Sequence, residues 1–319
     1  MQVIVKAPAK VNLSLEVLGR RPDGYHDIIS VMQALELSDD VKITLRGEGR
    51  GEGENSIEVI CDSPDVPEGP GNVAYRAARA LLDEAGRLEP RLADRHDIKI
   101  EITKNIPVAA GLGGGSSDAA AVLKGLNILL GEPVPEERLR EIGATIGADV
   151  PFFLSWPLAL AEGIGERLTP LKPLGGIWLV LVKPAFGVST AWVYSQLSLG
   201  LTNKSGDIKL PELNIFADRM AESADAGQPA RPADVSIIAS CLKNDLERVT
   251  VLRYPEIDVL KRRLTEAGAP GALMSGSGPT VFGVFRTEAE AQGAAEGLKD
   301  TGCRLIVTRT IPSWPAPVL

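Results

Sequence analysis

Apolar and polar residues alternate along the first part of the chain. Every second residue from Val3 to Val17 is apolar, while Lys10, Asn12 and Ser14 share the opposite side. A period of two predicts a half-buried strand, because successive side chains of a strand point to opposite faces of the sheet. On this segment alone, the polar side is either a solvated face or part of a site.

The rest of the chain mixes strand-like and helix-like patterns, without an internal repeat. Alternating or continuous apolar runs predict strands at Val41–Leu45, Asp97–Thr103, Ile177–Val182 and Val281–Phe285. Apolar residues three and four positions apart predict helices at Asn72–Leu82, Asp118–Leu130, Pro135–Ile146 and Pro255–Ala267. The pattern changes after about residue 163, so we expect two domains, residues 1–163 and 164–319.

Composition narrows the classes of function. Of 319 residues, 44% are hydrophobic and 24% are charged, as in ordinary globular proteins with one large or two medium cores. The formal net charge of −8 argues against a broad nucleic-acid or anionic-membrane surface, and we expect neither partner. The apolar runs are shorter than the ~18 residues that a membrane helix needs.

Cysteine usage indicates a reducing compartment. Cys61, Cys241 and Cys303 are far apart and have no metal-binding spacing, so we expect free thiols. The chain starts with a predicted strand rather than a secretory signal, and we therefore expect a cytoplasmic protein. We expect it to act on a small molecule as a monomer or homodimer.

The segment Pro107–Ser117 contains four glycines within five residues and ends in two serines, directly before the helix predicted from Asp118. A helix N-terminus carries unpaired backbone N–H groups and about half a positive charge. Glycines let the backbone approach a ligand closely. The strand–glycine loop–helix order therefore predicts a phosphate site.

Two well-known phosphate loops fit this segment poorly. A Walker A loop ends in Gly-Lys-Ser/Thr, but no lysine lies between Asn105 and Ala121. A dinucleotide-binding loop needs an acidic residue at the end of the next strand, whereas Glu136 and Glu137 open a predicted helix. A flexible linker is the remaining alternative, and it would not continue into a periodic helix.

Three other segments are candidates for chemistry. A Pro-Asp-Gly turn presents Tyr25 and His26, a pair that suits a planar ligand or is simply exposed. Asp149 follows Gly147 and precedes an apolar Val-Pro-Phe-Phe run, where a carboxylate is either a partly desolvated base or a turn-capping group. Small residues at Met274–Thr280 allow another segment to approach closely.

Taken together, these segments resemble the GHMP kinase superfamily. The resemblance rests on Ala7–Leu13, Pro107–Ser117, Gly147–Phe153 and Met274–Thr280, and extends from residue 3 to about 285. It implies an α+β protein of two domains, a ribosomal-S5-domain-2-like N-terminal domain and a ferredoxin-like C-terminal domain, with the site between them. The motifs at residues 22–27 and 183–190 resemble those superfamily members that phosphorylate the 2-hydroxyl of 4-(cytidine 5'-diphospho)-2-C-methyl-D-erythritol, in non-mevalonate isoprenoid precursor biosynthesis.

The resemblance also implies roles for individual residues. Lys10 and Asp149 would be the catalytic pair, and Tyr25 and Phe186 would sandwich the cytosine while His26 binds its edge. Asn12 and Thr190 would contact the substrate. ATP, with Mg²⁺, would bind at Pro107, Val108, Ala109, Ala110, Gly111, Leu112, Gly113, Gly114, Gly115, Ser116 and Ser117.

Some questions stay open at this point. Asp118 either faces away from the phosphates or helps to hold Mg²⁺, and Ser155 follows Asp149 in an unusual Ser-Trp-Pro run. The effect of the insertion at residues 199–233 on the cleft is undetermined. Another kinase of the superfamily and a non-catalytic nucleotide-binding regulator are the alternative functions.

Overall fold

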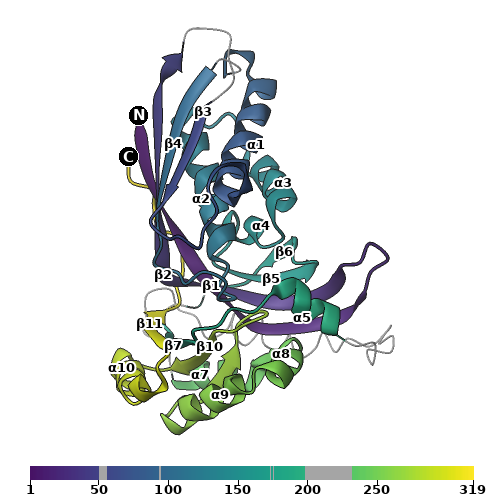
Figure 1. The fold of residues 1–319 in the computed structure, drawn as a ribbon, viewed down its shortest axis with the longest axis vertical. Coiled ribbons are helices and arrows are strands. Elements are labelled where there is room, and N and C mark those ends of the chain that lie inside the picture. The colour runs from purple at the N-terminus through teal and green to yellow at the C-terminus, as the bar shows by residue number, and fades with distance from the viewer. Residues whose placement is uncertain (50–55, 93–94, 173, 175, 198–231) are drawn as a thin grey trace.

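The structure, a computed structural model, describes the chain except for residues 50–55, 93–94, 173, 175 and 198–231. The insertion at 199–233 therefore lies outside the described residues, apart from its last two positions. Two sheets with their helices form the described part, and a long bent hairpin forms the middle of the first sheet (Figure 1).

The first sheet is built on that hairpin, β1 (Gln2–Arg20) and β2 (His26–Gly49). Its strand order is β3–β4–β2–β1–β8, and β5 pairs with both β2 and β6. The additional strands are β3 (Ser56–Cys61), β4 (Arg95–Thr103), β5 (Leu158–Gly163), β6 (Arg167–Pro170) and β8 (Lys243–Asn244). The pairs β3–β4 and β1–β8 are parallel, and the others are antiparallel.

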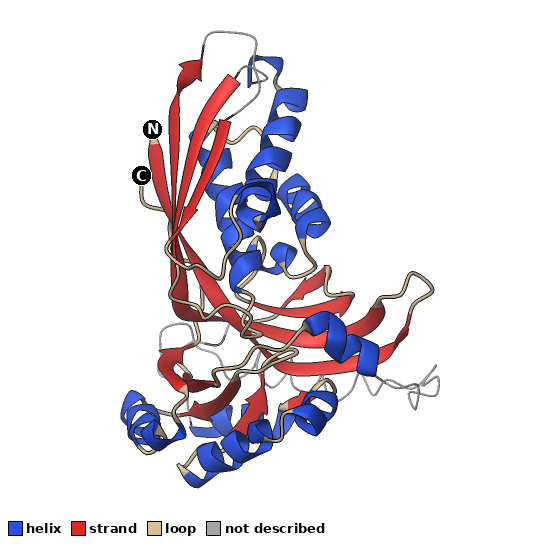
Figure 2. Ribbon diagram, in the orientation of Figure 1, coloured by secondary structure: helices blue, strands red, loops and turns tan. Residues whose placement is uncertain are grey.

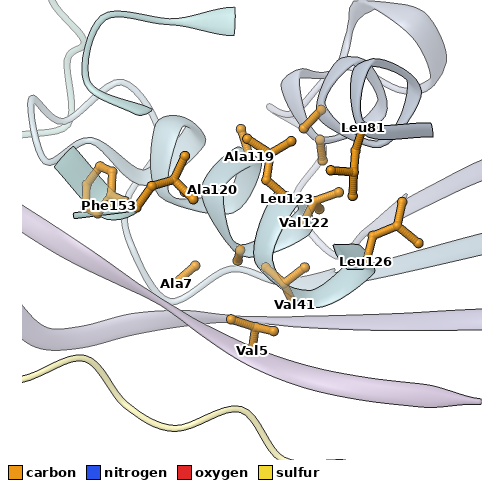
Figure 3. Close-up of a cluster of buried hydrophobic side chains, with 14 of the residues drawn as sticks. Val5, Ala7, Val41, Leu81, Ala119, Ala120, Val122, Leu123, Leu126 and Phe153 are labelled. Carbon is orange, nitrogen blue, oxygen red and sulfur yellow. The ribbon is translucent and has the colours of Figure 1, made fainter. Parts of the chain in front are cut away.

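Four helices cover one face of this sheet (Figure 2). They are α1 (Val73–Leu88), α2 (Gly114–Leu129), α3 (Glu136–Ile146) and α4 (Val150–Phe153). Val5, Ala7 and Val41 of the sheet lie beneath the apolar face of α2, with Leu81 of α1 above it (Figure 3). At Gly125 of α2 a Cβ atom would lie only 2.5 Å from Ile43 Cδ1, so the helix packs against the strands as closely as a glycine allows.

The second sheet has the order β11–β7–β10–β9, all antiparallel. Its strands are β7 (Trp178–Lys183), β9 (Gly271–Met274), β10 (Val281–Phe285) and β11 (Arg304–Arg309). Its helices are α5 (Thr190–Gln196), α7 (Pro232–Cys241), α8 (Glu247–Arg253), α9 (Glu256–Glu266) and α10 (Glu288–Glu296). A strand order of 4-1-3-2 with helices between the first two and last two strands is the ferredoxin-like arrangement.

The expected α+β fold is confirmed, and every predicted strand and helix is present, most of them with shifted ends and β10 with the predicted bounds. The strand predicted at Val41–Leu45 is the end of the much longer β2, which begins at His26, and α2 begins at Gly114 rather than at Asp118. Strands β6 and β8 extend the first sheet with residues beyond 163, while the division of the chain at residue 163 stays a prediction. None of the three cysteines forms a disulfide within the described part of the chain. Within the described residues, no helix is both long and apolar enough to span a membrane.

Candidate active site

A cleft of about 1290 Å³ lies where the glycine loop, the β1–β2 hairpin, α5 and the small-residue turn meet. Its walls include Lys10, Asn12, Tyr25, His26, Asp149 and Thr190, together with residues 107–116 of the loop. The structure therefore brings together nearly all of the residues that the sequence singled out. Two of them, Phe186 and Ser117, do not appear among the described residues that line the cleft.

Lys10 is fixed in the cleft by its own strand. Its backbone N–H donates to Leu112 O at 2.9 Å, which joins β1 to the glycine loop. Its side chain is only 6% exposed, and Nζ donates to Asn12 Oδ1 at 2.6 Å and lies 3.4 Å from Asp149 Oδ2. Asn12 Nδ2 in turn donates to Ser30 Oγ at 2.8 Å. The polar side of β1 is thus a buried network that orients the ammonium group, and not a solvated face.

Asp149 stands at the N-cap position of α4. No capping hydrogen bond from its side chain is present among the described residues, so the turn-capping alternative does not account for it. The carboxylate is instead about one-third exposed and paired with Lys10 across the cleft. This arrangement leaves a carboxylate oxygen accessible to a ligand hydroxyl beside a fixed positive charge.

The glycine loop presents the N-terminus of α2 to the cleft. Gly111 and Gly113 have φ angles of +76° and +73°, which L-residues adopt only with strain. Gly113 is the N-cap and has no side chain to cap the helix, so the N–H groups of the first turn point to the cleft unpaired. An anion is the natural partner of such a turn. Ser117 lies deeper, with its hydroxyl buried and unpartnered within the described part of the chain.

The small-residue turn packs directly against the glycine loop. Ser275 Oγ donates to Gly111 O at 3.0 Å, and Thr280 N donates to Ala110 O. A Cβ atom on Gly111 would lie 2.4 Å from Ser275 O. The close approach expected at this turn is therefore made by another loop. The adjoining Ser277 hydroxyl lies 2.8 Å from that of Thr190, which places Thr190 at the edge of the cleft.

At the far end of the cleft, the predicted Pro-Asp-Gly turn presents Tyr25 and His26. The turn is closed by Tyr25 N, which donates to Asp23 Oδ1 at 3.0 Å, and Tyr25 as a whole is 60% exposed. The His26 ring lies 5.2 Å from the ring of Tyr194 in α5. Burial, with a smaller contribution from Arg20, lowers the pKa of His26, so its imidazole is neutral at pH 7 and both donates and accepts.

Phe186, which is expected to sandwich the cytosine, does not line the described cleft, and its contact with the base stays a prediction. The Phe186 ring stacks on that of Tyr254 at 4.6 Å and 10°, and both rings are partly buried against the core of the second sheet. Tyr194 is an aromatic residue of the cleft wall that sequence reasoning missed, because α5 begins at Thr190 and turns its fifth residue toward His26. Burial and the charge of Asp149 raise the pKa of Tyr194, so a neutral phenol ring faces the cleft. An aromatic residue one turn into this helix was the available signal in the sequence.

Asp118 belongs to a buried cluster at the side of the cleft. Its Oδ2 pairs with Lys104 Nζ at 2.7 Å, and Lys104 also pairs with Asp39. Asp39 Oδ1 accepts the backbone N–H groups of Asn105 and Ile106, at the entry to the glycine loop. Two carboxylates thus share one ammonium, and burial raises the pKa of Asp118 to about 7. Its Oδ1 is buried without a hydrogen-bond partner among the described residues.

Comparison with known proteins shows the family to which this chain belongs. Residues 72–155 match the model of the GHMP kinases N terminal domain, and residues 231–302 match that of the GHMP kinases C terminal domain. The 4-diphosphocytidyl-2-C-methyl-D-erythritol kinase of Geobacter sulfurreducens is 49% identical over 310 residues, 97% of this chain and 99% of its own. The chain belongs to the 4-diphosphocytidyl-2-C-methyl-D-erythritol kinase family of GHMP kinases.

Solved structures agree with this membership. A 4-(cytidine 5'-diphospho)-2C-methyl-D-erythritol kinase structure is 32% identical with a TM-score of 0.70, covering 96% of this chain and 98% of its own. Homoserine kinase from Cytophaga hutchinsonii is 19% identical with a TM-score of 0.71, over 99% and 96% of the two chains, and shows the shared fold alone. As a GHMP kinase, this protein is an ATP-dependent phosphotransferase.

Proposed function

We propose that this kinase transfers the γ-phosphoryl group of ATP to the 2-hydroxyl of 4-(cytidine 5'-diphospho)-2-C-methyl-D-erythritol, in non-mevalonate isoprenoid biosynthesis. The observation that carries the proposal is the arrangement of Lys10 and Asp149 at 3.4 Å, between an anion-binding helix N-terminus and a pocket with Tyr25 and His26. The relatives named above support the identity of the substrate.

Asp149 acts as the general base. A tertiary hydroxyl is a weak nucleophile, and a positioned carboxylate that accepts its proton contributes about 10²–10⁴ in rate. Lys10 stabilises the negative charge that develops as the oxygen attacks phosphorus. Because Asn12 and Leu112 hold Lys10 before substrate arrives, the charge needs little reorganisation during the reaction. The remaining acceleration comes from alignment of the two substrates.

The first turn of α2 binds the ATP phosphates through its free N–H groups. Mg²⁺ supplies charge neutralisation on the transferred phosphoryl group and is usually held by one or two protein oxygens plus the phosphates. The buried, unpartnered oxygens of Ser117 and Asp118 fit that requirement, and these residues would hold the ion.

At the other end of the cleft, Tyr25 and Tyr194 hold the cytosine by its faces. Stacking accepts any base, at about 1–3 kcal/mol per base, so base preference must come from polar contacts. The neutral imidazole of His26 supplies such a contact to the cytosine edge. Thr190, fixed by Ser277, contacts the remainder of the substrate, while Asn12 serves mainly to hold Lys10.

We further propose a cytoplasmic enzyme, because its three cysteines form no disulfide within the described residues, as is usual in a reducing compartment. Its oligomeric state, monomer or homodimer, stays a prediction.

An assay of ADP release tests the function. The purified protein is offered ATP with the cytidine substrate, its uridine analogue, mevalonate or homoserine. We expect turnover of the cytidine substrate, with kcat/KM at least tenfold higher than for the uridine analogue. Turnover of mevalonate or homoserine alone would favour another kinase of the superfamily, and ATP binding without any transfer would favour a regulator.

A further inference from the structure

The base of this site stands on a very short helix. Helix α4 contains four residues, Val150–Phe153, and Asp149 is its N-cap. A single turn is unstable by itself, because helix nucleation fixes several residues for one hydrogen bond. Contacts from other elements must therefore set where Asp149 points.

On the cleft side, α4 packs against the glycine loop. A Cβ atom on Gly113 would lie 2.9 Å from Phe153 Cζ and 3.0 Å from Lys10 Cγ, so both side chains press on the N-cap of α2. Phe153 lies beside α2 in Figure 3. The position of this one ring thus links the base, the catalytic lysine and the phosphate loop.

On the opposite side, α4 is held by the C-terminal segment. Trp314 packs edge-on against Phe152 at 5.9 Å and lies 6.3 Å from Phe153. Its Nε1 donates to Ser155 O at 2.9 Å, so the first residue of the Ser-Trp-Pro run that follows α4 is a contact point for Trp314. These contacts fix the end of the turn.

Lys124 of α2 completes the contact. Its Nζ donates to Phe153 O at 2.8 Å and lies 5.0 Å from the centre of the Trp314 ring. Carbonyl groups at the end of a helix lack internal partners, and a cation there is favourable. Burial lowers the pKa of Lys124 to about 8, so its contacts compensate only in part for the hydration that it loses, and the ammonium form still predominates at pH 7.

The C-terminal segment is itself anchored to the first sheet. Val318 exchanges both backbone hydrogen bonds with Ile4 of β1, and Ile311 N donates to Ala34 O. Trp314 lies between these two attachment points, and prolines at 312, 315 and 317 restrict the backbone on either side. The segment therefore delivers the indole to α4 in a defined orientation.

We propose that Trp314 and Lys124 are positioning residues for the phosphoryl transfer, which fix α4 so that Asp149 stays aligned with Lys10 and the bound ATP. This inference rests on the proposed function. It predicts that loosening α4 slows the chemical step without weakening the binding of either substrate, because neither residue lines the cleft in the described structure.

The test compares Trp314→Leu, Trp314→Phe and Lys124→Met with the wild type in the same ADP-release assay. A misplacement of about 1 Å costs about 100-fold in rate, so we expect kcat to fall 10–100-fold in Trp314→Leu and Lys124→Met. Each KM should stay within about twofold. Trp314→Phe keeps a ring against Phe152 and should recover most of kcat. The double variant should lose little more than either single variant, since both act through α4.

Trp178→Leu is the matched control, because Trp178 also carries a cation–π contact, from Arg309 at 5.7 Å, but lies in β7 of the second sheet. Thermal melting of every variant shows the folded fraction at the assay temperature. An unchanged kcat in folded Trp314→Leu, or an equal loss in Trp178→Leu, would overturn the inference. If the wild type is inactive on the cytidine substrate, the proposed function is contradicted instead. Hydrogen exchange then still tests the support of α4, because the amides of residues 150–155 should exchange faster in Trp314→Leu than in Trp178→Leu.

Discussion

Lys10 Nζ lies 3.4 Å from Asp149 Oδ2, while its short hydrogen bond goes to Asn12. The lysine is nearly buried and the carboxylate is partly exposed. The ammonium group is thus fixed by the strand, and the carboxylate is the partner that a substrate hydroxyl can reach. This asymmetry supports the proposal that Lys10 stabilises charge and that Asp149 accepts the proton.

The Asp149→Asn variant tests this assignment. An amide has nearly the same shape but does not accept the proton, so we expect kcat to fall by about 10²–10⁴. ATP affinity, measured by titration calorimetry, should change by less than about threefold. Asp27→Asn is the control, since Asp27 pairs with Arg21 at 3.3 Å outside the cleft. Near-normal turnover of Asp149→Asn would remove Asp149 as the base.

A second prediction distinguishes the roles of two aromatic residues, Phe186 before α5 and Tyr194 within it. Because Tyr194 faces His26, Tyr194→Ala should raise KM for the cytidine substrate by about 5–150-fold, the equivalent of 1–3 kcal/mol of stacking. KM for ATP should stay constant, and Tyr194→Phe should retain binding. Phe186→Ala should lower the melting temperature and leave both KM values unchanged, because its ring packs on Tyr254. The opposite result would restore Phe186 to the cytosine pocket.

The difference between these residues shows where sequence patterns stop being informative. Alternation in β1 placed Lys10 and Asn12 on one side, and the Pro-Asp-Gly turn placed Tyr25 and His26, because spacing along a strand and turn chemistry are local. The choice between Phe186 and Tyr194 is not local. It depends on Tyr254, whose ring stacks on one face of Phe186, and on the residue at which α5 begins.

The same limit applies to the start of α2 and to Trp314. Glycine is a poor helix former, yet Gly114 begins α2, where a Cβ atom would lie 3.2 Å from Ile106 Cγ2 and 3.3 Å from Lys104 Nζ. Tertiary packing overrides the local preference there. Trp314 is far from α4 in sequence, and nothing in the spacing of its neighbours predicts that contact.

A third prediction concerns stability and pH at the Asp39–Lys104–Asp118 cluster. The pKa of Asp118 is raised to about 7 from an ordinary value of 3.8, so between these values the folded state holds a proton that the unfolded state releases. The free energy of unfolding contributed by Asp118 is therefore full below about pH 4 and falls as the pH rises through 7, by at most about 1.4 kcal/mol per pH unit. Asp118→Asn, which stays neutral, should remove this dependence.

Urea unfolding from pH 4.5 to 8 measures the effect. The stability of Asp118→Asn relative to the wild type should increase with pH over this range. Asp39→Asn is the comparison: its amide Oδ1 can still accept the two backbone N–H groups, but its Nδ2 replaces the oxygen that pairs with Lys104. The loss of that charged contact should destabilise the protein by about 1.5–3 kcal/mol, and because the charge of Asp39 helps to raise the pKa of Asp118, the pH dependence should become weaker as well. Parallel pH curves for Asp118→Asn and the wild type would contradict the raised pKa.

The contact between the glycine loop and the small-residue turn gives the last prediction. At Gly111 an alanine would meet two penalties: a φ of +76°, and a Cβ atom only 2.4 Å from Ser275 O. Gly131, just after α2, has a similar φ of +84° but nothing within 4 Å of the added carbon. Gly131→Ala should therefore cost about 1–2 kcal/mol of stability through backbone strain alone.

Gly111→Ala should cost about 1–3 kcal/mol more than Gly131→Ala. Its kcat/KM for ATP should also fall at least tenfold, because the glycine loop must move away from residue 275. Equal stabilities and equal ATP kinetics in the two variants would show that the loops do not need this backbone contact.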